Sequence, residues 1–213
     1  MMGISKSQNL KSNDDNLRKQ AILSYLALVS LWILANVVSE GIEEFSFFFE
    51  TVFALTQWLV LRRYIRNLGW WILTSIWGWT IYSILIQLFG VRNWIATMLP
   101  EGDMEIGGVP IGVQVFWASV LLRLLEWTII GIFQWLQLRR FIQHANWWIP
   151  ASALGGAVKG GLEFSIRTVI DGVPGALVGA CGYGAVTSIV LVLLLKNRIH
   201  KRLKRRQTFW SSV

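Results

Sequence analysis

Residues 57–63 read QWLVLRR, and residues 134–140, which lie 77 positions later, read QWLQLRR. The likeness continues through a Trp-Trp-Ile at residues 70–72 and again at 147–149, and twelve of the 22 positions from 57 to 78 are identical in the two copies. Self-similarity at a fixed offset is the sign of an internal repeat. Each copy has an apolar run before its arginines and another after its tryptophans. The repeated motif therefore predicts the end of one membrane span, a basic loop and the start of the next span.

Six apolar stretches qualify, or nearly qualify, as membrane-crossing helices, since about 20 mostly apolar residues cross a hydrocarbon core of about 30 Å. No stretch shows the sustained alternation that a membrane β-barrel requires. The fold class expected is thus all-α, a polytopic bundle of transmembrane helices. The predicted spans are 21–39, 45–61, 70–90, 115–138, 147–170 and 174–195, forming a membrane domain of residues 21–195 between a cytoplasmic segment, 1–20, and a basic cytoplasmic tail, 196–213.

The composition excludes several other classes of protein. Apolar and aromatic residues make up 54% of the 213 residues and charged residues only 15%, well below the share that a water-facing surface usually carries. One cysteine and two histidines are too few for a disulfide framework or a Cys/His zinc site, so neither a metal site nor a cofactor is expected. Thirteen tryptophans are typical of a protein with rings at a lipid–water boundary.

The charges predict the orientation. Outside the six spans, sixteen of the seventeen lysines and arginines fall on the side that holds both termini. Basic loops are retained in the cytoplasm, so we expect both the N-terminus and the C-terminus to be cytoplasmic. The net charge of +8 is then a consequence of membrane topology, and nucleic acid is not an expected partner.

The two motif copies suggest a chain of three helical hairpins, formed by spans 1 and 2, 3 and 4, and 5 and 6. A fainter third copy, LLLK at residues 193–196, ends the sixth span as LVLR at residues 59–62 ends the second. All the copies have the same orientation. The prediction is therefore a parallel internal repeat, unlike the inverted repeats of many secondary transporters.

The motif residues are expected at the inner membrane surface. Tryptophan rings suit the headgroup region, and arginines suit the anionic lipids of the inner leaflet. An anchored helical hairpin and a specific lipid-headgroup site are both open interpretations. The residues concerned are Trp58, Arg62, Arg63, Trp70 and Trp71 in the first copy and Trp135, Arg139, Arg140, Trp147 and Trp148 in the second.

With these two motif copies, the chain resembles uncharacterised bacterial multi-pass membrane proteins that carry a repeated QWLxLRR…WW motif. The resemblance covers residues 57–78 and 134–155 well, and the rest of the chain only by hydropathy. It implies a location in the bacterial inner membrane. No activity and no site residue follow from it.

Six ionisable residues fall inside the predicted spans, where each is costly to insert and is by default a hypothesis of function. Three are acidic and three are basic, so they can neutralise one another and hold spans 2, 4 and 5 in register. The alternative is a pathway for an ion, a proton or a polar ligand. The residues are Glu50, Arg123, Glu126, Lys159, Glu163 and Arg167.

Small residues recur at intervals of four in the last two spans, at Ser152, Gly156 and Gly160 in the fifth and at Gly175 and Gly179 in the sixth. This spacing lets helix backbones approach closely within lipid. We expect it to pack span 5 against span 6, and an oligomer contact or a narrow pore is the alternative.

No catalytic or nucleotide-binding signature is present, neither a metalloprotease, serine-hydrolase nor P-loop motif. The sequence therefore favours a non-enzymatic membrane scaffold or interaction protein that assembles with itself or with another membrane protein. The alternative function is a small-solute or ion transporter that uses the charges inside the spans.

Overall fold

The computed structural model describes residues 2–43, 49–170 and 175–210, and most of these residues are helical. The helices are α1 (Met2–Glu43), α2 (Phe49–Leu61), α3 (Trp71–Leu88), α4 (Val91–Met98), α5 (Val113–Leu138), the 3-10 turn η1 (Ala145–Trp147), α6 (Trp148–Val169) and α7 (Gly175–Trp210), and the strands are β1 (Asp103–Ile106) and β2 (Val109–Gly112).

Each predicted span overlaps one helix, although residues 45–48 of the second span and residue 174 of the sixth lie outside the described residues. The span ends predicted at the two motif copies agree closely with the helices. The sequence places the end of two spans at residues 61 and 138, which are the last residues of α2 and α5. The first and last helices are longer than their spans, since α1 begins at Met2 and α7 runs to Trp210. Neither helix contains proline, and both extensions contain leucine, lysine and arginine, which favour helix.

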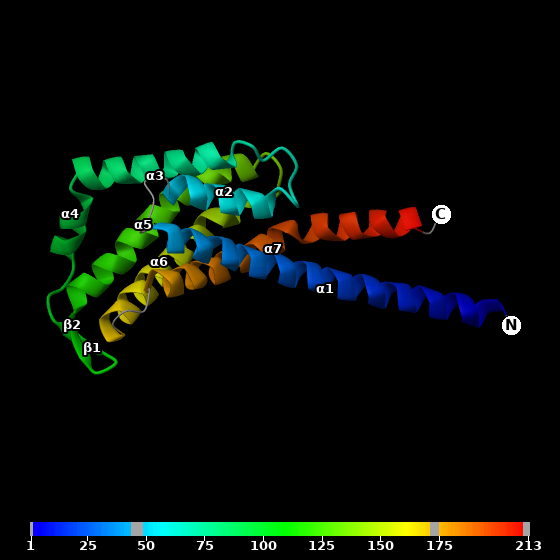
Figure 1. The fold of residues 1–213 in the computed structure, drawn as a ribbon, viewed down its shortest axis with the longest axis horizontal. Helices are drawn as coiled ribbons and strands as arrows, with labels where there is room; N and C mark the ends of the chain where they lie inside the picture. The colour runs from blue at the N-terminus through cyan, green and yellow to red at the C-terminus, as the bar shows by residue number, and fades with distance from the viewer. Residues whose placement is uncertain (1, 44–48, 171–174, 211–213) are drawn as a thin grey trace.

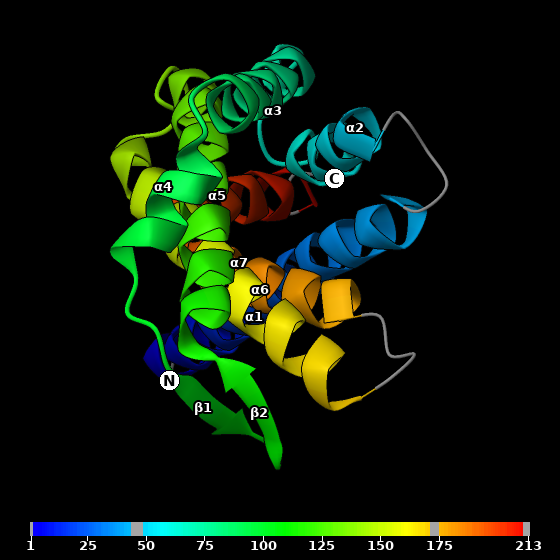
Figure 2. The same cartoon turned by 90° about the vertical axis from the view of Figure 1, so that its left-hand side faces the viewer.

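The helices form a bundle in which each long helix packs against its neighbours in the order α1, α2, α3, α5, α6, α7 and back to α1. Figure 2, which looks roughly along the bundle, shows this ring. The N-terminal part of α1 and the C-terminal part of α7 project from the same end of the bundle, and α4 and the two strands lie at the opposite end (Figure 1). We call these the terminal end and the hairpin end.

Four helices are long and apolar enough to cross a membrane: Asn16–Gly41 of α1, α3, α5 and Gly175–Arg205 of α7. Many of their large apolar side chains are exposed on the outside of the bundle, including those of Leu23, Trp77 and Leu88. In water such a surface would be an interaction patch, and in a bilayer it faces lipid. These features indicate a membrane location. The other two helices of the ring are not among these four: α6 carries three charged residues in its second half, and α2 is short, with 13 residues.

The buried core has two parts. The larger lies toward the terminal end and contains Trp32, Trp71 and Trp148, packed with leucines and isoleucines from α2, α5 and α7. The smaller lies nearer the hairpin end and is made by Phe53, Trp127, Ile130 and Tyr183. A layer of aromatic rings therefore fills the centre of the bundle.

A β-hairpin between α4 and α5 departs from the predicted all-α fold. Strands β1 and β2 pair antiparallel, with Ile106 opposite Val109. The two residues between them, Gly107 and Gly108, both have positive φ, the conformation that a tight two-residue turn requires. A Cβ on Gly107 would lie 2.9 Å from Val169, so the turn packs closely on the end of α6. Each strand has only four residues, which is too short for the apolar–polar alternation that predicts a β-strand to be recognised in the sequence.

The small residues of α6 serve packing within the chain. A Cβ on Gly156 would lie 2.5 Å from the carbonyl oxygen of Arg123, and one on Gly160 would lie 2.7 Å from that of Ser119, both in α5. On the other side, Gly179 of α7 lies against Lys159. The glycines thus bring α6 close to two helices, α5 as well as the predicted sixth span.

Candidate functional site

The charges predicted inside the spans gather around one residue of α6, Glu163. Its carboxylate lies 3.2 Å from the guanidinium of Arg123, 3.1 Å from that of Arg167 and 3.9 Å from the ammonium of Lys159. Lys159, Glu163 and Arg167 are spaced by four residues, so one face of α6 carries all three. Glu163 and Lys159 are buried, and Arg167 is exposed at the hairpin end.

Arg123 joins α5 to this group. One of its terminal nitrogens donates to Glu126 at 2.9 Å, and the other donates to Glu163 at 3.2 Å. Both carboxylates are buried, while 28% of the Arg123 side chain is exposed. Arg123 therefore holds two acidic groups on neighbouring helices. Glu126 pairs with this arginine three residues away, not with Lys159.

Glu40 of α1 completes the cluster, and the sequence prediction placed it wrongly. The first predicted span ends at residue 39, which left Glu40 in the loop beyond it, but Glu40 is buried and forms an ion pair with Lys159. The reason is that α1 continues to Glu43, which carries Glu40 into the bundle. The spacing could have predicted this burial. Glu40 comes four residues after Asn36 and eight after Trp32, so all three lie on one face of the same helix.

Glu50 does not join the cluster, contrary to the prediction. It lies in the first turn of α2 and is half-buried, and no ion pair among the described residues includes it. Helix α2 packs against α1 and α3, whereas the cluster spans α1, α5 and α6. An acidic group in a first helical turn interacts favourably with the helix dipole, which fits Glu50 there.

The charge cluster, defined as Glu40, Arg123, Glu126, Lys159, Glu163 and Arg167, has no net charge. Each carboxylate contacts at least one cation. Removing one member would leave a partner charged and buried, which is far more costly than the pair itself. Chemically, the arrangement is suited to fixing α1, α5 and α6 relative to one another.

A second polar group lies in the larger core and contains the two motif glutamines. The side-chain amide of Gln134 donates to Gln57 at 3.2 Å and to Ser75 at 3.0 Å, and its oxygen accepts from the indole of Trp148 at 3.0 Å. Gln57 in turn donates to Asn36 at 3.0 Å. All of these side chains are buried. We call this set of five side chains the amide core. A glutamine that recurs within an apolar run, at residues 57 and 134, is the feature of the sequence that could have predicted it.

Two of the predicted interface tryptophans are in fact core residues. Trp71 and Trp148 are fully buried, and their ring centroids lie 6.2 Å apart. The residues before them, Trp70 and Trp147, are each 62% exposed, as an interface position requires. Neighbouring residues on a helix point about 100° apart, so the two rings of each Trp-Trp pair face different sides, and here the second side faces the core. The prediction was wrong for the second ring of each pair.

Trp32 extends this aromatic contact to α1. Its ring centroid lies 5.7 Å from that of Trp148, and its indole donates to Thr187 of α7 at 2.9 Å. The residues LWILAN at 31–36 align with WWILTS at 70–75 and with WWIPAS at 147–152. This alignment is the sequence signal that would have placed Trp32 with the other two rings.

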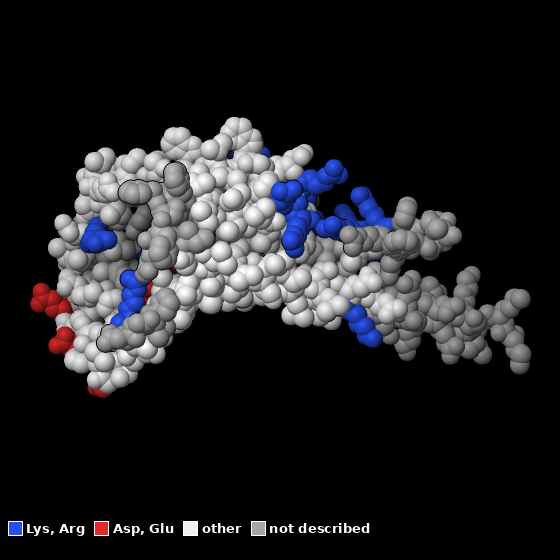
Figure 3. All heavy atoms as spheres, in the orientation of Figure 1, with Lys and Arg blue, Asp and Glu red and all other residues white. Residues whose placement is uncertain are grey.

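The remaining motif residues lie at the terminal end of the bundle. The guanidinium carbon of Arg62 lies 4.6 Å from the ring centroid of Trp58, and that of Arg139 lies 4.9 Å from the ring centroid of Trp135. Arg63 and Arg140 are exposed. Figure 3 shows lysines and arginines gathered there, while the acidic side chains in view gather at the hairpin end.

A basic groove of about 790 Å³ opens at the terminal end. It is lined by Arg62, Arg63, Tyr64, Arg66, Arg198, Lys201, Arg202 and Arg205. Arg202 donates to the carbonyl oxygen of Arg63 at 2.7 Å, which ties α7 to the loop after α2. Burial raises the pKa of Tyr64, and the positive charges of Arg63 and Arg202 oppose that rise.

Another cavity, of about 500 Å³, lies between α3 and α5 and reaches the charge cluster. Arg123, Tyr82 and Arg92 are among its lining residues. Its contact with Arg123 brings it to the edge of the charge cluster. Within residues 2–43, 49–170 and 175–210, no group of three histidine, cysteine, aspartate or glutamate side chains is placed to hold a metal ion.

Comparison of the chain with protein families, curated proteins and solved structures gives no significant match.

Proposed function

We propose that the protein is a non-enzymatic, multi-pass scaffold or interaction protein of the bacterial inner membrane. The observation that carries this proposal is the closed charge cluster. Its three carboxylates and three cations contact one another, so these six groups are engaged in joining α1, α5 and α6. A transport pathway would need at least one of them to exchange its partner for cargo.

Six spans are proposed in place of the four that composition alone supports. Helix α6 lies between α5 and α7, and its Lys159 and Glu163 are buried in ion pairs. Paired charges inside a bundle do not face lipid, so they do not prevent α6 from crossing. Helix α2 is about 20 Å long and can cross with the help of its flanking residues. Both termini then lie on one side, in agreement with their shared end in Figure 1.

The proposed parallel repeat is supported by matched positions in the three hairpins. Counterparts 77 and 134 residues apart share burial: Leu61, Leu138 and Leu195 are fully buried, and Ile65, Ile142 and Ile199 are nearly so. Asn67 and His144, also 77 apart, are the two non-glycine residues of the described chain with positive φ. Matched buried positions in three places, and a matched positive φ in two, thus support the repeat.

The proposed orientation places the terminal end, with its arginines, at the cytoplasmic leaflet. Anionic lipids would then surround Arg63, Arg140 and the basic part of α7. Single cysteines at Arg66, Arg140 and Asp103, in a chain whose Cys181 is replaced by serine, test this. A reagent that does not cross membranes should label intact cells only at position 103. Labelling at 66 or 140 without permeabilisation would contradict six spans with cytoplasmic termini.

The scaffold function predicts stable association in the membrane. Solubilised gently from its native membrane, the protein should migrate on a native gel in a complex larger than the monomer, and in denaturing detergent it should migrate as the 24.3 kDa chain. Migration as a monomer in both conditions would contradict a scaffold that acts through assembly.

Transport is the second candidate, and the 500 Å³ cavity beside Arg123 is the observation that favours it. Proteoliposomes separate the two functions. A scaffold should give proton, sodium and potassium fluxes equal to those of protein-free vesicles. A wild-type flux above that of protein-free vesicles, which persists in the exposed control Glu105→Gln and disappears in Glu163→Gln that is still folded, would instead establish transport.

A further inference from the structure

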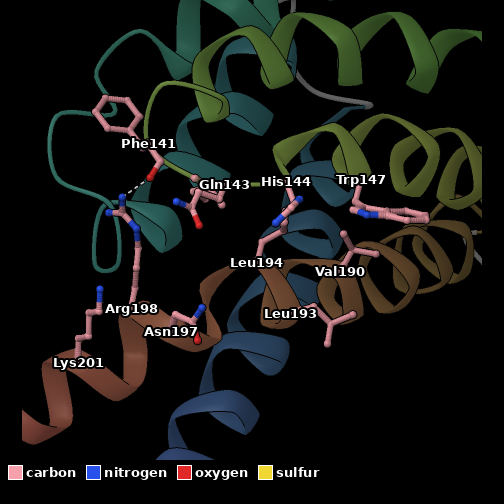
Figure 4. A pocket seen from close by; sticks show the side chains of 11 residues that line it. Phe141, Gln143, His144, Trp147, Val190, Leu193, Leu194, Asn197, Arg198 and Lys201 are labelled. Atoms are coloured by element: carbon pink, nitrogen blue, oxygen red, sulfur yellow. Dashed lines mark hydrogen bonds between the residues drawn. The ribbon is translucent and has the colours of Figure 1, made fainter.

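A cavity of about 750 Å³ lies at the terminal end of the bundle, between the loop that follows α5 and helix α7 (Figure 4). Its volume lies within the range of about 300–1,000 Å³ that small-molecule sites usually have. It is separate from the charge cluster and the amide core, none of whose residues line it. The side chains that line the cavity are basic at one end and apolar at the other, and this difference determines which ligand it can bind.

One end of the cavity is basic and rich in hydrogen-bond donors. Arg198, Lys201 and Asn197 of α7 lie there, and Phe141 and Gln143 of the facing loop are close by (Figure 4). Arg198 donates to the carbonyl oxygen of Phe141, which fixes its guanidinium at the cavity wall. Among the described residues, neither Arg198 nor Lys201 forms an ion pair. A fixed guanidinium beside a lysine is a favourable site for a phosphate group.

The other end of the cavity is apolar. Trp147, Val190 and Leu193 line it (Figure 4), and 62% of Trp147 and 66% of Leu193 are exposed. From Val190 to Lys201 the cavity follows α7 for about 16 Å, from apolar side chains to basic ones. An interfacial tryptophan lies beside this gradient, as expected at the depth where acyl chains meet headgroups.

We propose that this cavity is a specific site for an anionic glycerophospholipid. Arg198 and Lys201 bind its phosphate, and one acyl chain lies along Val190, Leu193 and Trp147. The site rests on the proposed function in one respect, because the terminal end must face the anionic cytoplasmic leaflet. It goes beyond that function by assigning one lipid class to one set of residues.

The neighbouring basic groove is a useful contrast. Arg198 and Lys201 belong to both hollows, but the rest of the groove is lined by arginines and Tyr64, with no aliphatic side chain. Such a surface attracts anionic lipids by charge alone. The cavity adds an apolar wall, and that wall is what should distinguish a lipid from a free phosphate.

The test measures lipid binding to the purified full-length protein in detergent, by native mass spectrometry. The probes are phosphatidylglycerol, which is anionic, and phosphatidylcholine, which has no net charge. Wild type should bind the first phosphatidylglycerol more tightly than phosphatidylcholine. Arg198→Ala with Lys201→Ala should weaken phosphatidylglycerol binding about tenfold or more, since two charge-assisted contacts are lost.

The matched control is Arg66→Ala with Arg140→Ala, which removes the same charge from positions outside this cavity. It should change the affinity by less than about twofold. Lys201→Ala alone removes an exposed side chain, so it reports binding even if the double variant folds poorly, and Lys201→Arg should retain binding. Leu193→Gln should weaken binding of the lipid without changing the net charge.

Three results would overturn the proposal. The first is wild-type affinity for phosphatidylglycerol in folded Lys201→Ala and in the double variant. The second is an equal loss in the control pair, which would show general attraction of charge. The third is displacement of the lipid by equimolar glycerol phosphate, which would make this a site for a free phosphate. Because none of these measurements involves flux or assembly, the lipid site and the scaffold function can fail separately.

Discussion

At the hairpin end of the bundle, α1, α5 and α6 are joined by ion pairs, whereas toward the terminal end α1, α2, α3, α5 and α6 are joined by tryptophan rings and amide hydrogen bonds. The amide core uses positions that recur in the motif copies, such as Gln57 and Gln134. The charge cluster uses positions that do not recur, such as Glu40 and Lys159. The comparison suggests that the repeat supplies the packing, and that charges added to single copies distinguish the helices.

The largest effect should come from the centre of the charge cluster. Glu163→Gln removes the negative charge that faces Arg123, Lys159 and Arg167. It leaves excess positive charge in a buried site, which costs about 3–5 kcal/mol of unfolding free energy in comparable cases. Reversible unfolding in bicelles measures this loss. Glu105→Gln, the same substitution on exposed β1, should have almost no effect, and equal stability of the two variants would contradict a structural cluster.

The amide core should give an intermediate effect. Gln134→Leu removes the acceptor of the Trp148 indole and the donor to Gln57 and Ser75. Leaving buried polar groups without partners costs about 1–3 kcal/mol. The same unfolding assay measures it, with Gln87→Leu on the exposed face of α3 as the control. If Gln134→Leu is as stable as its control, the motif glutamines do not hold the core together.

The smallest effect is expected at the repeated Trp–Arg contacts. Arg62→Gln and Arg139→Gln each remove a cation from a tryptophan face and should cost about 0.5–1 kcal/mol. Arg63→Gln and Arg140→Gln, one residue farther on, are the controls. Similar losses at positions 62 and 139 would support equivalent roles in the two copies. A loss at only one of them would weaken the repeat.

The sequence predicted the helices well because their determinants are local. Apolar runs and paired arginines marked the ends of α2 and α5 at residues 61 and 138. The sequence did not predict which side of each helix is buried against a neighbouring helix. Trp70 and Trp71 have the same chemistry, and only the packed bundle shows that the second is buried.

The charge cluster shows the same limit. Five of its six members were predicted as ionisable groups within spans, because each is a charged residue inside a long apolar stretch of sequence. The sixth, Glu40, was misplaced because a helix can continue past the end of an apolar run. Glu50 was included wrongly because it lies in an apolar stretch, and only the fold shows that α2 packs against α1 and α3. The tertiary structure decides which carboxylate pairs with Lys159, because its partner Glu40 lies in a different helix.

The central claim is that the buried charges are mutual partners, and the contact between Glu40 of α1 and Lys159 of α6 tests it most directly. A double-mutant cycle with Glu40→Gln and Lys159→Met, measured by unfolding in bicelles, isolates that contact. The pair predicts that the double variant loses less stability than the sum of the two single losses, by about 0.6 kcal/mol or more. Losses that add within about 0.3 kcal/mol would contradict the pair and, with it, the structural role of the charge cluster.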